Sequence, residues 1–167
     1  QLEATPYATS FTDGARSPET LTIPTAGGLN PQEGTIDVWV YVNDLIKDTT
    51  VNRYIWATTT NASSPYNNTL ALVHRSTGTW RLWIVDNSAY PQAVDIADTL
   101  GVGWHYFSCR WSQTEASLFI DGVKKGSVTN PSLPSNIANT LYVGSWNGSS
   151  GNPNTFIDDL RISSRAR

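Results

Sequence analysis

Residues 103–122 read GWHYFSCRWSQTEASLFIDG, and this stretch decides the fold. Its first half alternates between two faces, one carrying His105, Phe107, Cys109 and Trp111 and the other carrying Trp104, Tyr106, Ser108 and Arg110. Its second half alternates in the same way, with Ala116, Leu118 and Ile120 opposite Ser117, Phe119 and Asp121. Successive side chains of a strand point to opposite faces, so the stretch predicts a hairpin with two chemically different faces. The dipeptide Asp121-Gly122 predicts a tight turn into a further strand at 123–128.

Strand signals recur along the rest of the chain, separated by clusters of Gly, Pro, Asn and Ser. We predict further strands at 20–23, 35–42, 53–58, 70–75, 80–85, 93–96, 141–145 and 156–162. Many short strands at regular spacing, with no sustained helical period, are typical of an all-β sandwich. The expected fold is therefore a pair of packed antiparallel sheets.

Length and charge narrow the class of protein. A chain of 167 residues is long enough for one domain that buries about 70% of its unfolded surface. The net charge of −3 and the scattered Lys and Arg argue against a nucleic-acid surface, which needs a basic stripe. The apolar runs are too short to insert into a bilayer. The first residue is Gln, so we expect a piece of a larger chain with adjacent domains, or a processed form.

Four segments in order resemble a laminin G-like domain, a member of the concanavalin A-like lectin/glucanase superfamily. They are SFTDGARSPETLTIP at 10–24, EGTIDVWVYVND at 33–44, the hairpin GWHYFSCRW…ASLFIDGVKKG at 103–126, and the run from NTLYVGSW to the end at 139–167. The resemblance implies a jelly roll over residues 10–167. Residues 1–9 are then either a linker from a preceding module or a first edge strand.

Glycoside hydrolases share this superfamily fold, so a catalytic function would require a suitably spaced pair of carboxylates in the sequence. A retaining hydrolase holds two carboxylates about 5–5.5 Å apart, which on a strand means acids two residues apart. No such alternation exists, and the adjacent Asp158 and Asp159 are expected on opposite faces. His74 and His105 are interpreted as structural, and Cys109, in phase with core residues, as a small buried hydrophobe. The sequence therefore predicts a protein that is not an enzyme.

A structural calcium ion is implied by the resemblance. Modules of this kind hold calcium between an N-terminal loop and an acid on the last long strand, and the matching residues here are Asp13 and Asp158. Asp158 is in phase with Leu160 and Ile162, and a carboxylate on an apolar face is costly unless it is paired or bound to metal. The alternative is that Asp158 caps backbone amides or pairs with an arginine such as Arg16.

Aromatic residues suggest a carbohydrate ligand, because seven Trp and seven Tyr exceed what one core usually takes. Aromatic rings stack on the apolar faces of sugars. We predict that one concave sheet carries the ligand-binding residues, namely Tyr41, Trp56, Arg81, Trp83 and Arg110. The resemblance gives Trp39 and Trp104 a structural role, so both are left out. Loop residues are an alternative to this set, because binding sites concentrate on loops: Tyr66, Tyr90, Trp146 and Asn147.

The expected function is a non-catalytic, lectin-like module of a larger extracellular, cell-surface or virion-surface protein, with a glycan or polysaccharide as ligand. An alternative is a structural or adhesion domain of a bacterial surface or phage tail protein that contacts protein. A third interpretation is a divergent glycoside hydrolase.

Overall fold

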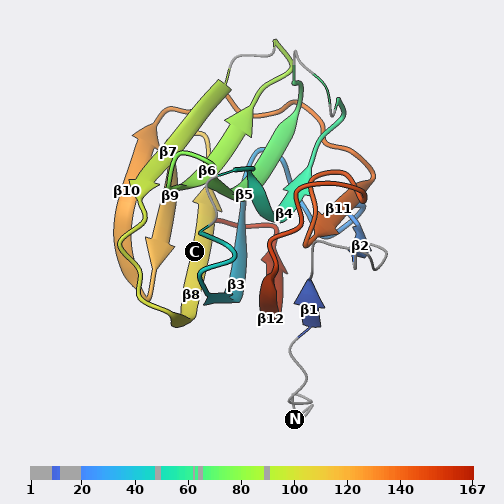
Figure 1. The fold of residues 1–167 in the computed structure, drawn as a ribbon. Helices are drawn as coiled ribbons and strands as arrows, with labels where there is room; N and C mark the ends of the chain where they lie inside the picture. The colour runs from blue at the N-terminus through green and yellow to red at the C-terminus, as the bar shows by residue number, and fades with distance from the viewer. Residues whose placement is uncertain (1–8, 12–19, 48–49, 62, 64–65, 89–90) are drawn as a thin grey trace, which may run out of the picture.

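The computed structural model describes the backbone of residues 9–11 and the chain at 20–47, 50–61, 63, 66–88 and 91–167. Two six-stranded antiparallel sheets pack face to face, as predicted (Figure 1). Sheet A contains, in spatial order, β1 (Thr9–Phe11), β12 (Thr155–Ser163), β3 (Gly34–Val42), β8 (Gly103–Trp111), β9 (Glu115–Ile120) and β10 (Val123–Thr129). Sheet B contains β2 (Leu21–Pro24), β11 (Thr140–Val143), β4 (Arg53–Thr58), β5 (Thr69–Arg75), β6 (Thr79–Val85) and β7 (Pro91–Ala97).

The hydrophobic core lies between the two sheets and is built from alternate residues of each strand. Strand β3 of sheet A contributes Ile36, Val38, Val40 and Val42, and strand β6 of sheet B contributes Trp80, Leu82 and Ile84. All seven side chains are fully buried. Burial of each aliphatic side chain of this kind stabilises the fold by about 1.5–3 kcal/mol. The alternation also sends the residues between them to the outer faces of the two sheets.

The predicted hairpin is confirmed. In β8 and β9 the inward side chains are Phe107, Cys109, Trp111, Ala116, Leu118 and Ile120, all buried. Ile120 pairs with Val123, which leaves Asp121 and Gly122 as a two-residue turn. Both turn residues have positive φ, 52° and 77°, as the twist of a tight hairpin requires.

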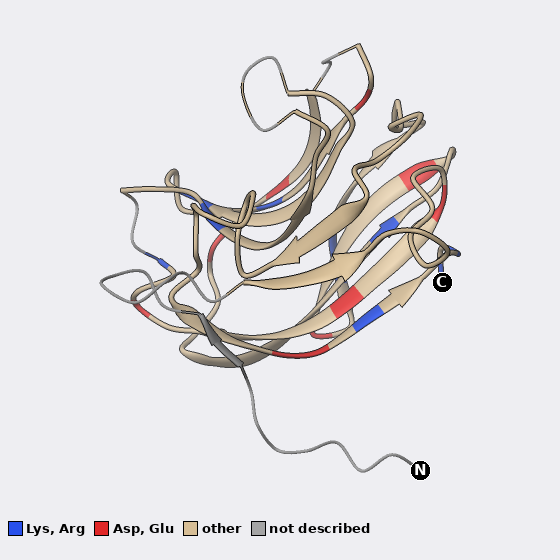
Figure 2. Cartoon of the chain, turned by 90° about the vertical axis from the view of Figure 1, so that its right-hand side faces the viewer, with Lys and Arg blue, Asp and Glu red and all other residues tan. Residues whose placement is uncertain are grey.

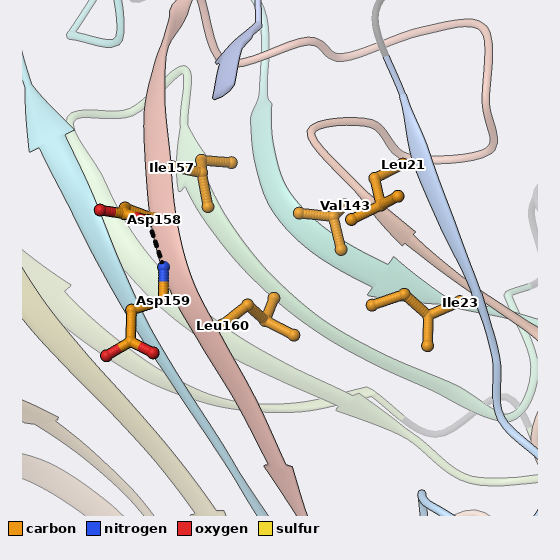
Figure 3. A pocket seen from close by; sticks show the side chains of 7 residues that line it. All are labelled: Leu21, Ile23, Val143, Ile157, Asp158, Asp159 and Leu160. Atoms are coloured by element: carbon orange, nitrogen blue, oxygen red, sulfur yellow. Dashed lines mark hydrogen bonds between the residues drawn. The ribbon is translucent and has the colours of Figure 1, made fainter. Parts of the chain in front are cut away.

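The two sides of the sandwich differ. On one side β10 approaches β7 so closely that a Cβ atom on Gly126 would lie 2.9 Å from a methyl carbon of Val94. On the other side, β12 of sheet A faces β2 and β11 of sheet B across an apolar gap of about 210 Å³. Figure 3 shows the aliphatic side chains that line this gap, Leu21, Ile23, Val143, Ile157 and Leu160.

Candidate binding surface

Five aromatic side chains of the adjacent strands β12, β3 and β8 gather on the outer side of sheet A, and we call this surface the outer aromatic face. Its members are Trp39 and Tyr41 of β3, Trp104 and Tyr106 of β8, and Phe156 of β12. Trp39, Trp104 and Phe156 are 38%, 42% and 41% exposed. Among the residues that the structure describes, these three are the only aromatic side chains in the set of exposed large hydrophobic residues.

The strand register brings these rings together in cross-strand pairs. Trp39 pairs with Tyr106 and Tyr41 pairs with Trp104, because β3 and β8 run antiparallel. The ring centroids lie 5.3 Å apart in the first pair and 5.6 Å apart in the second. Phe156 extends the second pair, with its centroid 6.1 Å from that of Tyr41. The ring planes in these contacts are inclined by 51° to 75°, so the rings do not form one flat platform.

Acidic side chains border the aromatic pairs. Asp37 pairs in register with Arg161, and Asp158 pairs with Trp39. Asp159 accepts two hydrogen bonds from the Arg161 guanidinium, at 3.0 and 2.6 Å. Burial raises the pKa of the Tyr106 phenol, and the charge of Asp37 and a hydrogen bond with it raise that pKa further. Tyr106 is therefore a neutral hydrogen-bonding phenol beside a carboxylate.

A β-bulge in β12 determines which way the acids point. The register shifts between Asp158 and Arg161, and Asp159 adopts a positive φ of 48°. Ile157 and Leu160 consequently point toward the aliphatic gap, while the carboxylates of Asp158 and Asp159 both point away from it (Figure 3). The prediction that the two acids lie on opposite faces is therefore wrong. The bulge breaks the simple alternation on which that prediction depended.

The predicted calcium ligands are only partly described. Asp158 is exposed and is not on the apolar face with Leu160 and Ile162, so the burial argument for a metal is wrong. Its Oδ1 accepts the backbone N–H of Asp159 at 2.8 Å, the backbone-capping role that the sequence left open. Within the described ranges, no group of three or more His, Cys, Asp or Glu side chains is placed to hold a metal ion. Asp13 and Arg16 lie outside the described residues, so calcium binding stays a prediction.

A second aromatic cluster covers the outer side of sheet B. Trp146, from the loop after β11, packs between Tyr54 of β4 and Trp83 of β6, with centroids 4.8 and 5.6 Å away. Tyr66 contacts both tryptophans edge-on. Trp146 and Tyr54 are only 6% and 8% exposed. The chain's own loop therefore covers much of this face.

Two of the predicted ligand residues border this second cluster. Trp83 is half-buried beneath Tyr66 and Trp146. Arg81 donates two hydrogen bonds to Asp95, at 2.7 and 2.6 Å, so its guanidinium is held within the sheet surface. These bonds also lower the pKa of Asp95.

The five predicted ligand residues do not share one surface. Tyr41 and Arg110 belong to sheet A, whereas Arg81 and Trp83 belong to sheet B and face the opposite way. Arg110 lies over the Phe119 ring, 4.0 Å from its centroid, and donates to Ser108. Of the predicted set, only Tyr41 is part of the outer aromatic face.

The predicted position of Trp56 is wrong. A bulge between Tyr54 and Trp56 breaks the alternation in β4, so the two side chains do not share a face. Tyr54 joins the outer cluster, while Trp56 is fully buried between the sheets. A surface ligand does not reach it.

The predicted ligand set missed four of the five residues of the outer aromatic face, Trp39, Trp104, Tyr106 and Phe156. The resemblance gave Trp39 and Trp104 a structural role, yet both are more than one-third exposed. The signal was present in the alternation, which put Trp39 in phase with Tyr41 and Trp104 in phase with Tyr106. Among the predicted loop residues, Tyr66 and Trp146 join the covered cluster on sheet B, Asn147 is exposed, and Tyr90 lies outside the described residues.

Sequence comparison agrees with this architecture. A laminin G model, described as the concanavalin A-like lectin/glucanases superfamily, matches residues 14–167. The chain belongs to this superfamily. No curated protein sequence matches significantly.

Solved structures resemble this concanavalin A-like domain at low sequence identity, which supports the fold alone. The mouse laminin alpha1 chain, domains LG4-5, aligns with a TM-score of 0.70 at 12% identity, over 98% of this chain and 43% of that one. The binding domain of botulinum neurotoxin DC, in complex with SialylT, aligns with a TM-score of 0.73 at 12% identity, over 99% and 41%. The botulinum neurotoxin serotype D binding domain aligns with a TM-score of 0.63 at 15% identity, over 88% and 40%. The present chain thus spans about two-fifths of each of these chains.

The groups of this concanavalin A-like domain that could serve catalysis make structural contacts. His74 Nε2 lies 3.1 Å from a carboxylate oxygen of Asp98, and His105 Nδ1 lies 2.7 Å from one of Asp121. Burial raises the pKa of the Cys109 thiol well above its ordinary value, which disfavours the reactive thiolate. Figure 2 shows the basic residues of the described chain scattered over strands and loops. The described residues include no helix able to cross a membrane.

Proposed function

We propose that this domain is a non-catalytic, lectin-like module that binds a carbohydrate through the outer aromatic face of sheet A. The observation that carries the proposal is the gathering of Trp39, Trp104 and Phe156, each more than one-third exposed, on one face. Large exposed apolar side chains in a group mark interaction sites, because scattered single ones are the norm on a soluble surface.

Sugar rings suit this surface. Each pyranose has an apolar face that packs on an aromatic ring and a rim of hydroxyls that need hydrogen bonds. Trp39 and Trp104 offer the rings, and Asp158 offers carboxylate oxygens beside Trp39. The tilt of the rings relative to one another favours a single flexible glycan chain over a flat crystalline surface, which would need coplanar rings.

The outer side of sheet B supports the proposal by contrast. Trp146 of the domain's own loop already covers the cluster there, and Asp95 already engages Arg81. A ligand at that face would have to displace the loop. The outer aromatic face of sheet A has no comparable cover among the described residues.

The biological setting is also proposed. We expect the module to belong to a larger extracellular, cell-surface or virion-surface protein. A similar fold in laminin and in a toxin binding domain solved in complex with SialylT supports this setting. Because the chain spans about two-fifths of those solved chains, neither their ligands nor their partners transfer directly.

The alternative is a structural or adhesion domain of a bacterial surface or phage tail protein. Exposed Trp and Phe beside Arg161 are also residue types enriched in protein interfaces. On that alternative the same face contacts a protein. A divergent glycoside hydrolase is the third candidate, and turnover of a β-glucan that is lost on changing one acidic residue would revive it.

Affinity electrophoresis through gels containing a panel of polysaccharides tests the proposal. We expect at least one polysaccharide to retard the domain, and Trp39→Ala and Trp104→Ala each to weaken binding about tenfold, the range for truncating an aromatic anchor. Leu21→Ala changes an exposed apolar residue of sheet B, and Arg81→Ala changes the other outer face. Both controls should bind normally. Absence of retardation on every polysaccharide would move the assignment to the protein-binding alternative.

A further inference from the structure

The outer aromatic face carries information about the class of glycan, an inference that rests on the proposed function. Two aromatic pairs follow one another along β3 and β8, first Trp39 with Tyr106 and then Tyr41 with Trp104. Because Trp39 and Tyr41 are two residues apart on one strand, the pairs are separated by about 6.6–6.8 Å. A pyranose is about the size of one six-membered aromatic ring, so a single sugar covers one pair. Full use of the face needs at least two linked sugars.

Carboxylates adjoin the pair of Trp39 and Tyr106, which disfavours an anionic ligand there. Asp158 pairs in register with Trp39, Asp37 pairs with Arg161, and Asp159 is bonded to the Arg161 guanidinium. Among these four charged groups of the described chain, three are acidic and one is basic. The bulge in β12 adds to this imbalance, since it turns Asp159 to the same side as Asp158 (Figure 3). Carboxylates accept hydrogen bonds from sugar hydroxyls but repel sulfate and carboxylate groups.

Two arginines on the outer side of sheet A, Arg161 and Arg110, already make side-chain contacts. Both Nε and Nη2 of Arg161 donate to Asp159, and this contact raises the pKa of the guanidinium. Arg110 lies over Phe119 and donates through Nε to Ser108. A bidentate fork through Nε and Nη2 of Arg161 would first have to break its bonds to Asp159, and one through Nε of Arg110 would have to break its bond to Ser108.

We infer that the outer aromatic face binds a neutral oligosaccharide of two or more sugars and discriminates against sialylated, sulfated or uronic-acid glycans. Trp39 with Tyr106 and Trp104 with Tyr41 hold successive sugars, and Asp158 receives hydroxyl hydrogen bonds next to Trp39.

A glycan array that carries neutral oligosaccharides of increasing length beside matched sialylated and sulfated versions tests the inference. We expect binding from the disaccharide upward and about tenfold weaker binding to each anionic counterpart. Asp158→Asn keeps the shape of the side chain and removes its charge, so it should narrow the preference for the neutral member. Trp104→Ala should weaken both members alike.

The outcomes separate this inference from the proposed function. Binding that is stronger to the anionic member, or full-strength binding to a monosaccharide, would overturn the inference and leave a glycan-binding module. An unchanged neutral preference in Asp158→Asn would remove Asp158 from the argument for discrimination and so contradict the inference as stated. Absence of signal on every neutral and anionic glycan would instead reject the proposed function itself.

Discussion

Gly34, at the start of β3, lies directly against the indole of Trp111. A Cβ atom at this position would lie 2.3 Å from Cζ2 of that ring. The ring is fixed by its burial and by a hydrogen bond from Nε1 to the carbonyl of Asn30, at 3.0 Å. The smallest residue is thus required for one of the three fully buried tryptophans to fit.

We therefore predict that Gly34→Ala lowers the free energy of unfolding by about 1–3 kcal/mol, the usual range for overpacking a core. Urea unfolding followed by tryptophan fluorescence measures the loss. Gly28→Ala is the matched control, because a Cβ atom there meets nothing within 4 Å. Equal stability of the two variants would show that Trp111 moves aside without cost.

Single residues also show where sequence reasoning stopped. Trp56 looked like a surface residue because it is two positions from Tyr54, and simple alternation puts such residues on one face. The bulge between them adds one residue to that count and moves Trp56 into the core. Neither Gly nor Pro marks the bulge in this strand, so no local signal revealed it.

At the scale of strands, alternation succeeded wherever a strand is regular. The inward and outward residues of β3, β8 and β9 were predicted from sequence, and with them the positions of Tyr41 and Arg110 on an outer face. Alternation gave wrong faces for residues of β4 and β12, where bulges shift the register. The fold follows from the majority of regular strands, whereas the candidate site borders one of the irregular ones.

Strand β12 also carries the one described residue of the predicted calcium site. The resemblance pairs Asp158 with Asp13, and only an ion that binds the folded chain can stabilise it. We predict that calcium at about one hundred times its dissociation constant raises the melting temperature by about 5–10 °C, and that EDTA reverses the rise. Asp158→Asn should abolish the response.

Asp44→Asn serves as the control, because Asp44 is an exposed carboxylate in the loop after β3. The rise in melting temperature that calcium causes in this variant should equal the rise in the unmodified domain. A melting temperature that is the same in calcium and in EDTA would refute the calcium prediction, and Asp158 would keep only its contact with the Asp159 amide.

In the whole molecule, the two sheets give their outer faces different properties. The loop after β11 returns over sheet B and places Trp146 on Tyr54 and Trp83, whereas sheet A leaves Trp39 and Trp104 exposed. Sequence reasoning mixed residues of both faces in one predicted site. Strand order is a long-range property, and nothing in the local pattern states which sheet a given strand joins or which loop covers it.

A buried network joins three segments of the molecule and makes its stability depend on pH. His74 of β5 is 1% exposed, contacts Asp98 through Nε2, and packs edge-on against Trp80. Lys47 lies 3.8 Å from the same carboxylate, and Arg53 pairs with His74 in the strand register. Burial lowers the pKa of His74 below its ordinary value of 6.5, although Asp98 acts in the opposite direction.

The sign of the effect follows from this lowered pKa. The unfolded chain takes up a proton near pH 6.5, whereas folded His74 resists protonation until a lower pH. The contribution of neutral His74 to the free energy of unfolding is therefore fully present above pH 6.5. It declines as the pH falls from 6.5 toward the lower pKa of the folded state. A second loss of stability is expected below about pH 4, and it comes from Asp95. The hydrogen bonds from Arg81 lower the pKa of Asp95 below 3.8, so their contribution is lost as this carboxylate becomes protonated.

Urea unfolding between about pH 7.5 and pH 5 measures the first decline, and His74→Gln should reduce it because glutamine does not titrate. His105→Gln is the matched control, since it removes the other histidine and should leave the part due to His74 intact. Nuclear magnetic resonance titration of the His74 ring gives a readout that survives if the variant folds poorly. A ring pKa at or above 6.5, or an equal decline in His74→Gln and the unmodified domain, would refute the assignment of this acid sensitivity to His74.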